Sequence, residues 1–306
     1  MDSWRRCLDA AGVHDRDVRA DYAVAARYLR RHQEFAAWGA IRVLAPAEFV
    51  PHAVAGLAFI SFTDDICDRG TPVERARGFG VWSGHVRTAL ATGGSRHPLL
   101  RAFVRSIRAC GLSRGWADAY VTGMRIDLSF PGFADEAAYQ RYVDTVSWPG
   151  VMLVTGLTPH LVPDEDFAVS CRLAADAIQR VDFLTDLADD LRGGYLALPQ
   201  SDLDHHGVTR ADLEQGLRTP AVGALVAVTA AKARATLEAA GRVVGEVPAA
   251  YRPLVTCLLE LYHQRLDNVE IRGAAVARRG VRDNPWECLR LIRRARGTGL
   301  PAAARR

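Results

Sequence analysis

Long stretches rich in Ala, Leu and Arg, separated by Pro and Gly, are the feature that most constrains the fold of this chain. These three residue types are good helix formers, and segments that alternate apolar and polar residues, as strands do, are almost absent. The Pro and Gly positions are spread along the chain rather than gathered in a linker, which is typical of turns within one body. We therefore predict an all-α protein of eight or more helices, folded as a single domain over residues 1–306.

The expected helices can be bounded by Pro and Gly positions and by acidic residues at their starts. They cover residues 52–68, 73–91, 99–110, 115–128, 136–146, 222–244 and 251–279. A further long helix starts near Phe167, after three consecutive acidic residues, and ends before Gly193 and Gly194. Acidic side chains favour a helix N-terminus, and glycine is the usual residue just past a C-terminus.

The charge of the chain gives little reason to expect a nucleic-acid partner. There are 39 Lys and Arg against 35 Asp and Glu in 306 residues, a net charge of +4, and no basic motif appears. A field that weak does not favour binding to DNA or RNA. The longest apolar runs, 53–60 and 221–231, are too short to cross a bilayer, so we expect no transmembrane segment.

The cysteines and the N-terminal residues favour a cytoplasmic location. The six cysteines are scattered, without a CxxC pair or histidines at zinc-binding spacing. Such cysteines are typical of reduced, small apolar core residues in a cytoplasmic protein. The first residues contain no apolar stretch of the kind found in secretory signals, which agrees with that expectation.

Two groups of aspartates are the most informative features for function. Asp64 and Asp68 are four residues apart near the end of their predicted helix, so they project from the same face. On the long helix, Asp182, Asp186 and Asp190 fall on successive turns of one stripe. Like charges at that spacing repel by about 0.2–0.5 kcal/mol per pair, and both helices are otherwise strongly apolar. A solvated acidic face would explain either group alone, but both together favour a bound cation.

Mg²⁺ is the cation that best matches these groups. It is a hard ion that prefers carboxylate oxygen and leaves positions open for substrate phosphates. Two facing carboxylate stripes inside a helical bundle would hold a magnesium-bound diphosphate. The metal would stabilise the departing diphosphate, and an apolar, partly aromatic cavity would protect the resulting allylic carbocation from water. We therefore predict metal-dependent chemistry on a diphosphate, with all five aspartates as metal ligands and catalytic residues.

The sequence around these aspartates resembles the squalene/phytoene synthase family, the head-to-head branch of the trans-isoprenyl diphosphate enzymes. The family's first signature, DxxxD, is matched by residues 64–68, and its second, QxxNxxRDxxEDxxRGRxYLP, is matched in register by residues 179–199. Residues 123–128 resemble its GMxMDL segment, and residues 262–273 resemble its YxxLLDxIExRGY helix. The resemblance covers about residues 35–290. It implies the all-α isoprenoid synthase fold, a single helical bundle with a central cavity, and Mg²⁺-dependent ionisation of a prenyl diphosphate.

Several positions depart from the family pattern. Ser61 and Thr185 stand where the family usually has arginine before each acidic motif, and Asp182 stands where it has asparagine. Arginines at such positions are expected to bind diphosphate through bidentate hydrogen bonds, so their loss removes two phosphate-binding side chains. Asp182 would add a carboxylate for the metal. In the family's VAGxVG segment, Trp148 would shorten or reshape a channel built for C15 or C20 chains if it points inward.

These departures favour a transferase that uses one prenyl diphosphate rather than two. Some enzymes similar to squalene synthase transfer a prenyl group to an aromatic acceptor, such as a carbazole, in secondary metabolism, and we predict that this chain does so. The prenyl donor would lie between dimethylallyl and geranylgeranyl diphosphate. Head-to-head condensation of two prenyl diphosphates and cyclisation of one are alternatives. A non-catalytic helical assembly protein is disfavoured because both acidic motifs are retained.

Other side chains are candidates for binding the substrate. Gln179 would orient the substrate or a metal-bound water. The diphosphate also needs cationic partners, and the candidates are Arg42, Arg141, Arg192 and Arg272. Aromatic rings would stabilise the carbocation if they face it, although core packing is an equal alternative for each. The aromatic candidates are Phe35, Trp38, Phe62, Trp148 and Phe183.

Overall fold

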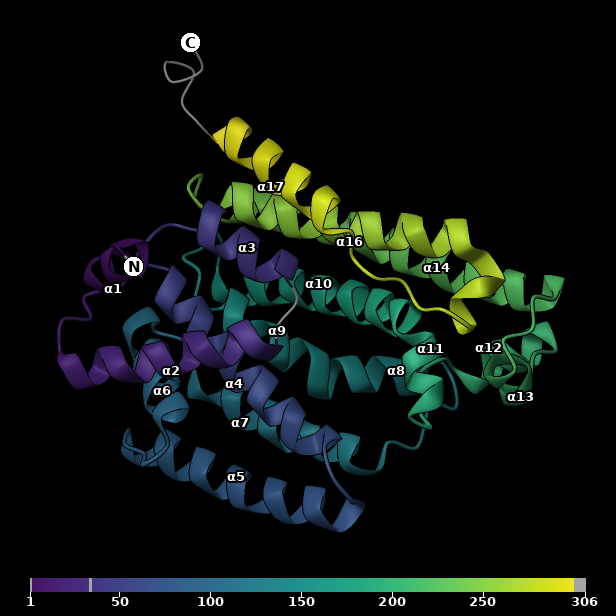
Figure 1. Cartoon of the computed structure of the whole chain (residues 1–306), viewed down its shortest axis with the longest axis horizontal. Coiled ribbons are helices and arrows are strands. Elements are labelled where there is room, and N and C mark those ends of the chain that lie inside the picture. The colour runs from purple at the N-terminus through teal and green to yellow at the C-terminus, as the bar shows by residue number, and fades with distance from the viewer. Residues whose placement is uncertain (1, 33–34, 300–306) are drawn as a thin grey trace.

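The computed structural model describes residues 2–32 and 35–299, and within those ranges the chain is a bundle of α-helices (Figure 1). One parallel bridge, between Phe133 and Pro199, is the only strand-like pairing in the described ranges. The prediction of an all-α fold is therefore confirmed.

The helices of the first half run from α1 to α9. They are α1 (Asp2–Ala10), α2 (Arg16–His32), α3 (Phe35–Leu44), α4 (Val50–Asp68), α5 (Pro72–Thr92), α6 (Pro98–Cys110), α7 (Arg114–Gly123), α8 (Glu136–Tyr142) and α9 (Trp148–Thr155). The helices of the second half are α10 (Asp164–Thr185), α11 (Leu187–Arg192), α12 (Gln200–His206), α13 (Arg210–Glu214), α14 (Pro220–Ala240), α15 (Val243–Glu246), α16 (Arg252–Arg272) and α17 (Pro285–Gly299).

Most of the predicted helices are present, with ends within a few residues of the expected ones. Three of them are shorter than predicted: a 3₁₀-helix, Met124–Ser129, follows α7, a π-helical turn, Val143–Ser147, follows α8, and a 3₁₀-helix, Gly273–Ala277, follows α16. Helices α1 to α3, α9, α12, α13 and α17 are additional to the predicted set. In α2, arginines interrupt the apolar residues, and its fully buried stripe is narrow, with Tyr22, Ala25 and Leu29 each 0% exposed.

Helix α4 lies inside the first half of the bundle, where it packs against α2, α5, α6 and α9. Most of its side chains are buried, although it carries two aspartates at its C-terminal end. Gly56 brings α4 very close to α9, because a Cβ at this position would lie 2.6 Å from the carbonyl oxygen of Leu153. Because the rest of α4 is closely packed, its aspartates must find their partners at its C-terminal end.

The long helix predicted from Phe167 to Gly193 is divided into α10 and α11 at Asp186, whose φ of −97° and ψ of 0° depart from helical values. A tertiary contact causes the break: the carbonyl of Thr185 accepts a hydrogen bond from the N–H of Val281 at 2.8 Å. Gly280 permits this approach, because a Cβ there would lie 2.3 Å from the same oxygen. The prediction that the aspartates of this region form one straight stripe is therefore wrong.

Candidate functional site

The first group of carboxylates lies at the end of α4. The hydroxyl of Tyr120, on α7, donates a hydrogen bond to Oδ1 of Asp64 at 2.6 Å. Burial is the main reason that the pKa of Asp64 rises to about 7; the Tyr120 bond lowers it, while the charges of Asp68 and Asp127 raise it further. Burial also raises the pKa of Asp68. The Asp64 carboxylate is therefore held where ionisation is unfavourable without a nearby cation, whereas Asp68, which is exposed, remains open to solvent and ligands.

Asp127 belongs to the same group, although it was not among the predicted site residues. It lies on the 3₁₀-helix that follows α7 and packs against α4. The hydroxyl of Tyr142 donates to its Oδ2 at 3.3 Å. Burial raises its pKa to about 6, and the charge of Asp68 adds to this effect. The resemblance to the GMxMDL segment was a signal for this residue, but its role depends on the turn that brings it to α4.

Asp190, on α11, faces this first group. Burial is the main reason that its pKa rises to about 7, followed by the charges of Asp186 and Asp189 and then that of Asp68. The influence of Asp68 across the site means that the two acidic motifs, which are more than a hundred residues apart, lie within electrostatic range of each other. The fold therefore brings the predicted residues Asp64, Asp68 and Asp190 to one place.

Asp182 is paired with an arginine from another helix, and its part in metal binding stays a prediction. Nη1 of Arg265, on α16, donates to Oδ1 of Asp182 at 3.2 Å, while Nε and Nη2 of the same arginine donate to Asp283 at 2.9 and 2.7 Å. Arg265 is only 6% exposed. The inference that the acidic residues of this helix lack a paired cation is therefore wrong for Asp182, because the cation comes from α16.

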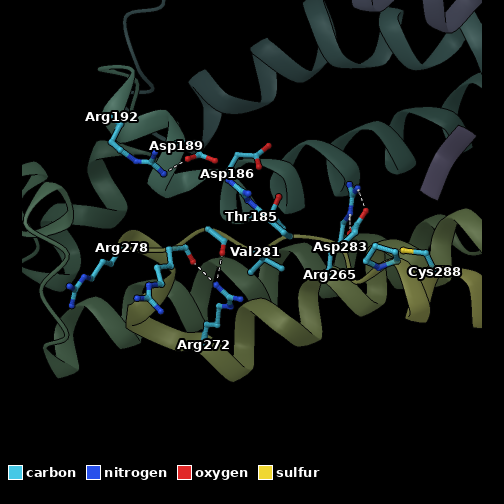
Figure 2. A pocket seen from close by; sticks show the side chains of 14 residues that line it. Thr185, Asp186, Asp189, Arg192, Arg265, Arg272, Arg278, Val281, Asp283 and Cys288 are labelled. Atoms are coloured by element: carbon cyan, nitrogen blue, oxygen red, sulfur yellow. Dashed lines mark hydrogen bonds and ion pairs between the residues drawn. The ribbon is translucent and has the colours of Figure 1, made fainter. Parts of the chain in front are cut away.

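An arginine-rich cavity of about 630 Å³ opens beside Asp186 (Figure 2). In Figure 2, Asp186, Asp189 and Arg192 lie on one side, and side chains of α16 and of residues 278–285 lie on the other. The arginines that line it are Arg192, Arg265, Arg272, Arg278, Arg279 and Arg282. Guanidinium groups bind phosphate oxygens in a bidentate manner, so the cavity suits a phosphorylated ligand.

Two of the predicted arginines line this cavity, and their contacts differ. Arg192 forms an ion pair with Asp189 across one turn of α11. Arg272 donates from Nη1 to the carbonyl oxygens of Arg279 and Gly280, at 2.8 and 2.6 Å, and so holds the neighbouring segment in place. Arg42 is outside the site: it is exposed on α3 and donates to the hydroxyl of Ser3, on α1, at 2.9 Å.

Arg75, on α5, is a basic residue of the site that the sequence patterns did not indicate. Its positive charge lowers the pKa of Asp68. Its Nη1 donates to the hydroxyl of Tyr195 at 2.9 Å. Its Nε is buried and has no hydrogen-bond partner among the described residues.

Of the predicted aromatic residues, Phe183 borders the acidic site. Its ring packs against those of Phe133 and Tyr142, with centroids 5.9 and 6.0 Å away, and Tyr142 is the residue that donates to Asp127. Phe62 lies elsewhere. It is two residues before Asp64, so it projects from another face of α4. There its ring meets those of Tyr28 and Trp82, and its predicted contact with the substrate is not supported.

Trp148 and Gln179 lie deeper in the bundle. The Trp148 ring packs against Trp116, with centroids 5.1 Å apart, and its buried Nε1 has no partner among the described residues. Gln179 accepts a hydrogen bond from the hydroxyl of Ser147 at 2.8 Å. Trp38 lies under the guanidinium of Arg42 rather than near an aspartate. The side chain of Phe35 lies outside the described residues.

The carboxylates do not by themselves form a closed metal site. Among the described residues, no three His, Cys, Asp or Glu side chains come close enough to hold one metal ion. The chemistry of the group nevertheless fits Mg²⁺, because the donors are carboxylate oxygens whose burial and mutual repulsion call for a cation. Mg²⁺ commonly takes one or two carboxylates and completes its shell with water and substrate phosphates.

The squalene/phytoene synthase family model matches residues 29–287 of this chain. The chain belongs to the squalene/phytoene synthase family. Members of this family are prenyltransferases of isoprenoid metabolism, so the resemblance read from the aspartate motifs is confirmed. Within the described ranges, none of the helices has the length and apolar character needed to span a bilayer.

Similar proteins include a bifunctional protein and presqualene diphosphate synthases. The bifunctional protein CrtB/UppS of Streptomyces coelicolor is 30% identical over 291 residues, which are 94% of this chain and 50% of that protein, so this chain spans about half its length. A presqualene diphosphate synthase of Sinorhizobium fredii is 28% identical over 230 residues, covering 74% of this chain and 80% of that protein.

Solved structures confirm the fold of the family. The squalene synthase HpnC from Alicyclobacillus acidocaldarius is similar with a TM-score of 0.72 and 25% identity, over 88% of this chain and 97% of that one. A dehydrosqualene synthase has a TM-score of 0.81 and 17% identity, over 92% and 97% of the two chains. The predicted isoprenoid synthase fold is therefore confirmed.

Proposed function

We propose that this protein is a Mg²⁺-dependent prenyltransferase that condenses two prenyl diphosphates head to head. The observation that carries the proposal is the pair of facing acidic groups, Asp64 and Asp68 on α4 and Asp190 on α11, beside a cavity lined by six arginines. The carboxylates would share metal ions with a diphosphate, and the arginines supply positive charge for phosphate that the metal does not neutralise. The relatives named for presqualene diphosphate synthesis support this reaction class.

The structure weakens the reason for predicting a single diphosphate. That prediction depended on a set of departures from the family pattern, among them the missing arginines at Ser61 and Thr185. Thr185 lines the arginine-rich cavity, where guanidinium groups from α11, α16 and residues 278–282 surround it. A phosphate bound beside Thr185 would therefore meet arginines from other parts of the chain. Transfer to an aromatic acceptor stays a prediction, and the experiment below distinguishes it from head-to-head condensation.

The residues of the site have separable roles in the proposed reaction. Asp64, Asp68, Asp190 and, from the cavity side, Asp186 would hold Mg²⁺, which when bound stabilises the negative charge of the departing diphosphate. Tyr120 holds the Asp64 carboxylate in place through its hydrogen bond. The rings around Phe183 would keep water from the allylic carbocation.

The test is a matrix of substrates. The purified protein is incubated with Mg²⁺ and geranyl, farnesyl or geranylgeranyl diphosphate, with and without NADPH as reductant and with and without a panel of aromatic acceptors. We expect diphosphate release from one prenyl diphosphate alone and a product that contains two prenyl groups. Release that requires an aromatic acceptor, with a product one prenyl group heavier than the acceptor, would overturn head-to-head condensation in favour of aromatic transfer. If no prenyl diphosphate is consumed in any mixture, both are wrong.

A further inference from the structure

Arg75 is a cation in the acidic site that has no anionic partner among the described residues. It lies on α5, one turn after Thr71, whose side chain caps this helix. Arg75 forms no ion pair with any described residue; its guanidinium makes one hydrogen bond, from Nη1 to the hydroxyl of Tyr195 at 2.9 Å. Its Nε is buried and unpaired within the described ranges. A buried donor without a partner is unfavourable, so this geometry is explained if a ligand accepts from it.

The interactions of Arg75 place it beside both acidic groups. Its partner Tyr195 follows α11, and the backbone N–H of Tyr195 donates to the carbonyl of Asp190 at 2.8 Å. On the other side, the charge of Arg75 acts on Asp68, at the end of α4. The guanidinium therefore lies where the end of α4 and the end of α11 approach each other.

Neighbouring arginines are already in an ion pair, lie on an exposed face or line the other cavity. Arg69 is 65% exposed and forms an ion pair with Asp65 at 2.8 Å, so its charge is already neutralised. Arg77 is exposed on another face of α5. The six arginines of the cavity in Figure 2 come from α11, α16 and residues 278–282, and Arg75 does not line that cavity.

We propose that Arg75 and Tyr195 form a phosphate-binding subsite beside Asp68, separate from the arginine-rich cavity. Nε and the terminal nitrogens of a guanidinium form a planar fork that binds two phosphate oxygens at once. The Tyr195 hydroxyl accepts from Arg75 and keeps its own proton, which it donates to a further phosphate oxygen. The ligand is a diphosphate group with its Mg²⁺, and this choice of ligand rests on the proposed function. The subsite replaces the arginine that is missing at Ser61.

The subsite is tested by binding rather than by turnover. Isothermal titration calorimetry measures the affinity of inorganic pyrophosphate, with Mg²⁺ present, for the full chain and for Arg75→Gln, Arg75→Lys, Tyr195→Phe and Arg77→Gln. We expect Arg75→Gln to weaken binding at least about tenfold and Tyr195→Phe about threefold or more, because charge-assisted hydrogen bonds are lost. Arg75→Lys should lie between Arg75→Gln and the parent protein. The matched control, Arg77→Gln, should stay within about twofold, since its side chain is on the exposed face of α5.

Equal affinities for Arg75→Gln and Arg77→Gln would overturn the subsite, and so would a parent protein that binds no pyrophosphate. Circular dichroism melting checks that each variant is folded. If Arg75→Gln is unfolded, Arg75→Lys and Tyr195→Phe decide the question, and unchanged binding in both refutes it. A protein that consumes no prenyl diphosphate but loses pyrophosphate binding on Arg75→Gln would refute the proposed function and leave the subsite in place.

Discussion

Replacing Asp64 by Asn should stabilise the metal-free protein at pH 8. Asp64 has a folded-state pKa of about 7, raised from 3.8 mainly by burial and also by the charges of Asp68 and Asp127. Between pH 3.8 and about pH 7 the folded state keeps a proton that the unfolded state has lost, so the stability of the fold decreases as the pH rises. The full cost of ionising the buried carboxylate is present above pH 7. Asn has no charge to lose, and its side-chain oxygen still accepts the hydrogen bond from Tyr120.

The size of the effect follows from the two pKa values. A rise from 3.8 to about 7 corresponds to about 4 kcal/mol at 1.36 kcal/mol per unit. The Asn amide must also be buried, so we expect about half of this, or about 2 kcal/mol, at pH 8. The cost of burying the amide is the same at both pH values, whereas the cost of ionising Asp64 falls to about 2 kcal/mol at pH 5, so the variant and the parent should have nearly equal stability there. With an unfolding entropy of about 2.1 cal/mol/K per residue, a chain of this length should gain about 3 °C in Tm at pH 8.

The assay is thermal unfolding at pH 5 and pH 8 in EDTA, repeated at pH 8 with Mg²⁺ and pyrophosphate. In EDTA, Asp64→Asn should melt above the parent protein at pH 8, with a much smaller difference at pH 5. With Mg²⁺ and pyrophosphate the order should reverse, because only the parent keeps the carboxylate that binds the metal. A difference that is the same at both pH values, or a variant less stable than the parent in EDTA at pH 8, would refute the reasoning.

Three further changes test the site and the packing around it. Asp68→Ala should lower kcat on the order of 100-fold or more while the far-UV circular dichroism is unchanged; an active variant would remove Asp68 from the metal site. Arg265→Ala removes a buried guanidinium that pairs with two half-buried carboxylates and should cost about 3 kcal/mol by urea unfolding, whereas Arg234→Ala, which breaks more exposed pairs, should cost about 1 kcal/mol or less. Equal costs would mean that the burial of Arg265 does not strengthen its ion pairs. Gly280→Ala should lower both Tm and activity because its Cβ would lie 2.3 Å from the α10 carbonyl, whereas Gly84→Ala, with open space in exposed α5, should stabilise by about 0.5–1 kcal/mol. If Gly280→Ala matches the parent in both measurements, the contact does not set the geometry of the site.

Local patterns were sufficient to find most of the helices and the aspartates at the centre of the site. The spacing of Asp64 and Asp68 in an apolar helix is visible in a few residues of sequence, and in the fold the charge of Asp68 acts on Asp190 from the second motif. The same patterns misjudged Asp182, because its partner Arg265 is 83 residues later in the chain. They left Phe62 open between contact with the substrate and core packing, and its ring packs against Tyr28 and Trp82.

Sequence by itself therefore determined the helical class, the family and the two acidic motifs, since each of these depends on residues that are neighbours along the chain. Only the tertiary structure decided which arginine pairs with which aspartate, and which arginine is left to bind a ligand. Arg265 neutralises Asp182, whereas Arg75 reaches Tyr195 across 120 residues and forms no ion pair among the described residues. The tertiary structure also decided where the second acidic helix breaks, because the N–H of Val281 donates a hydrogen bond to the carbonyl of Thr185 at 2.8 Å. The physical reason is that charges and backbone groups pair through space, and the partners come from distant segments.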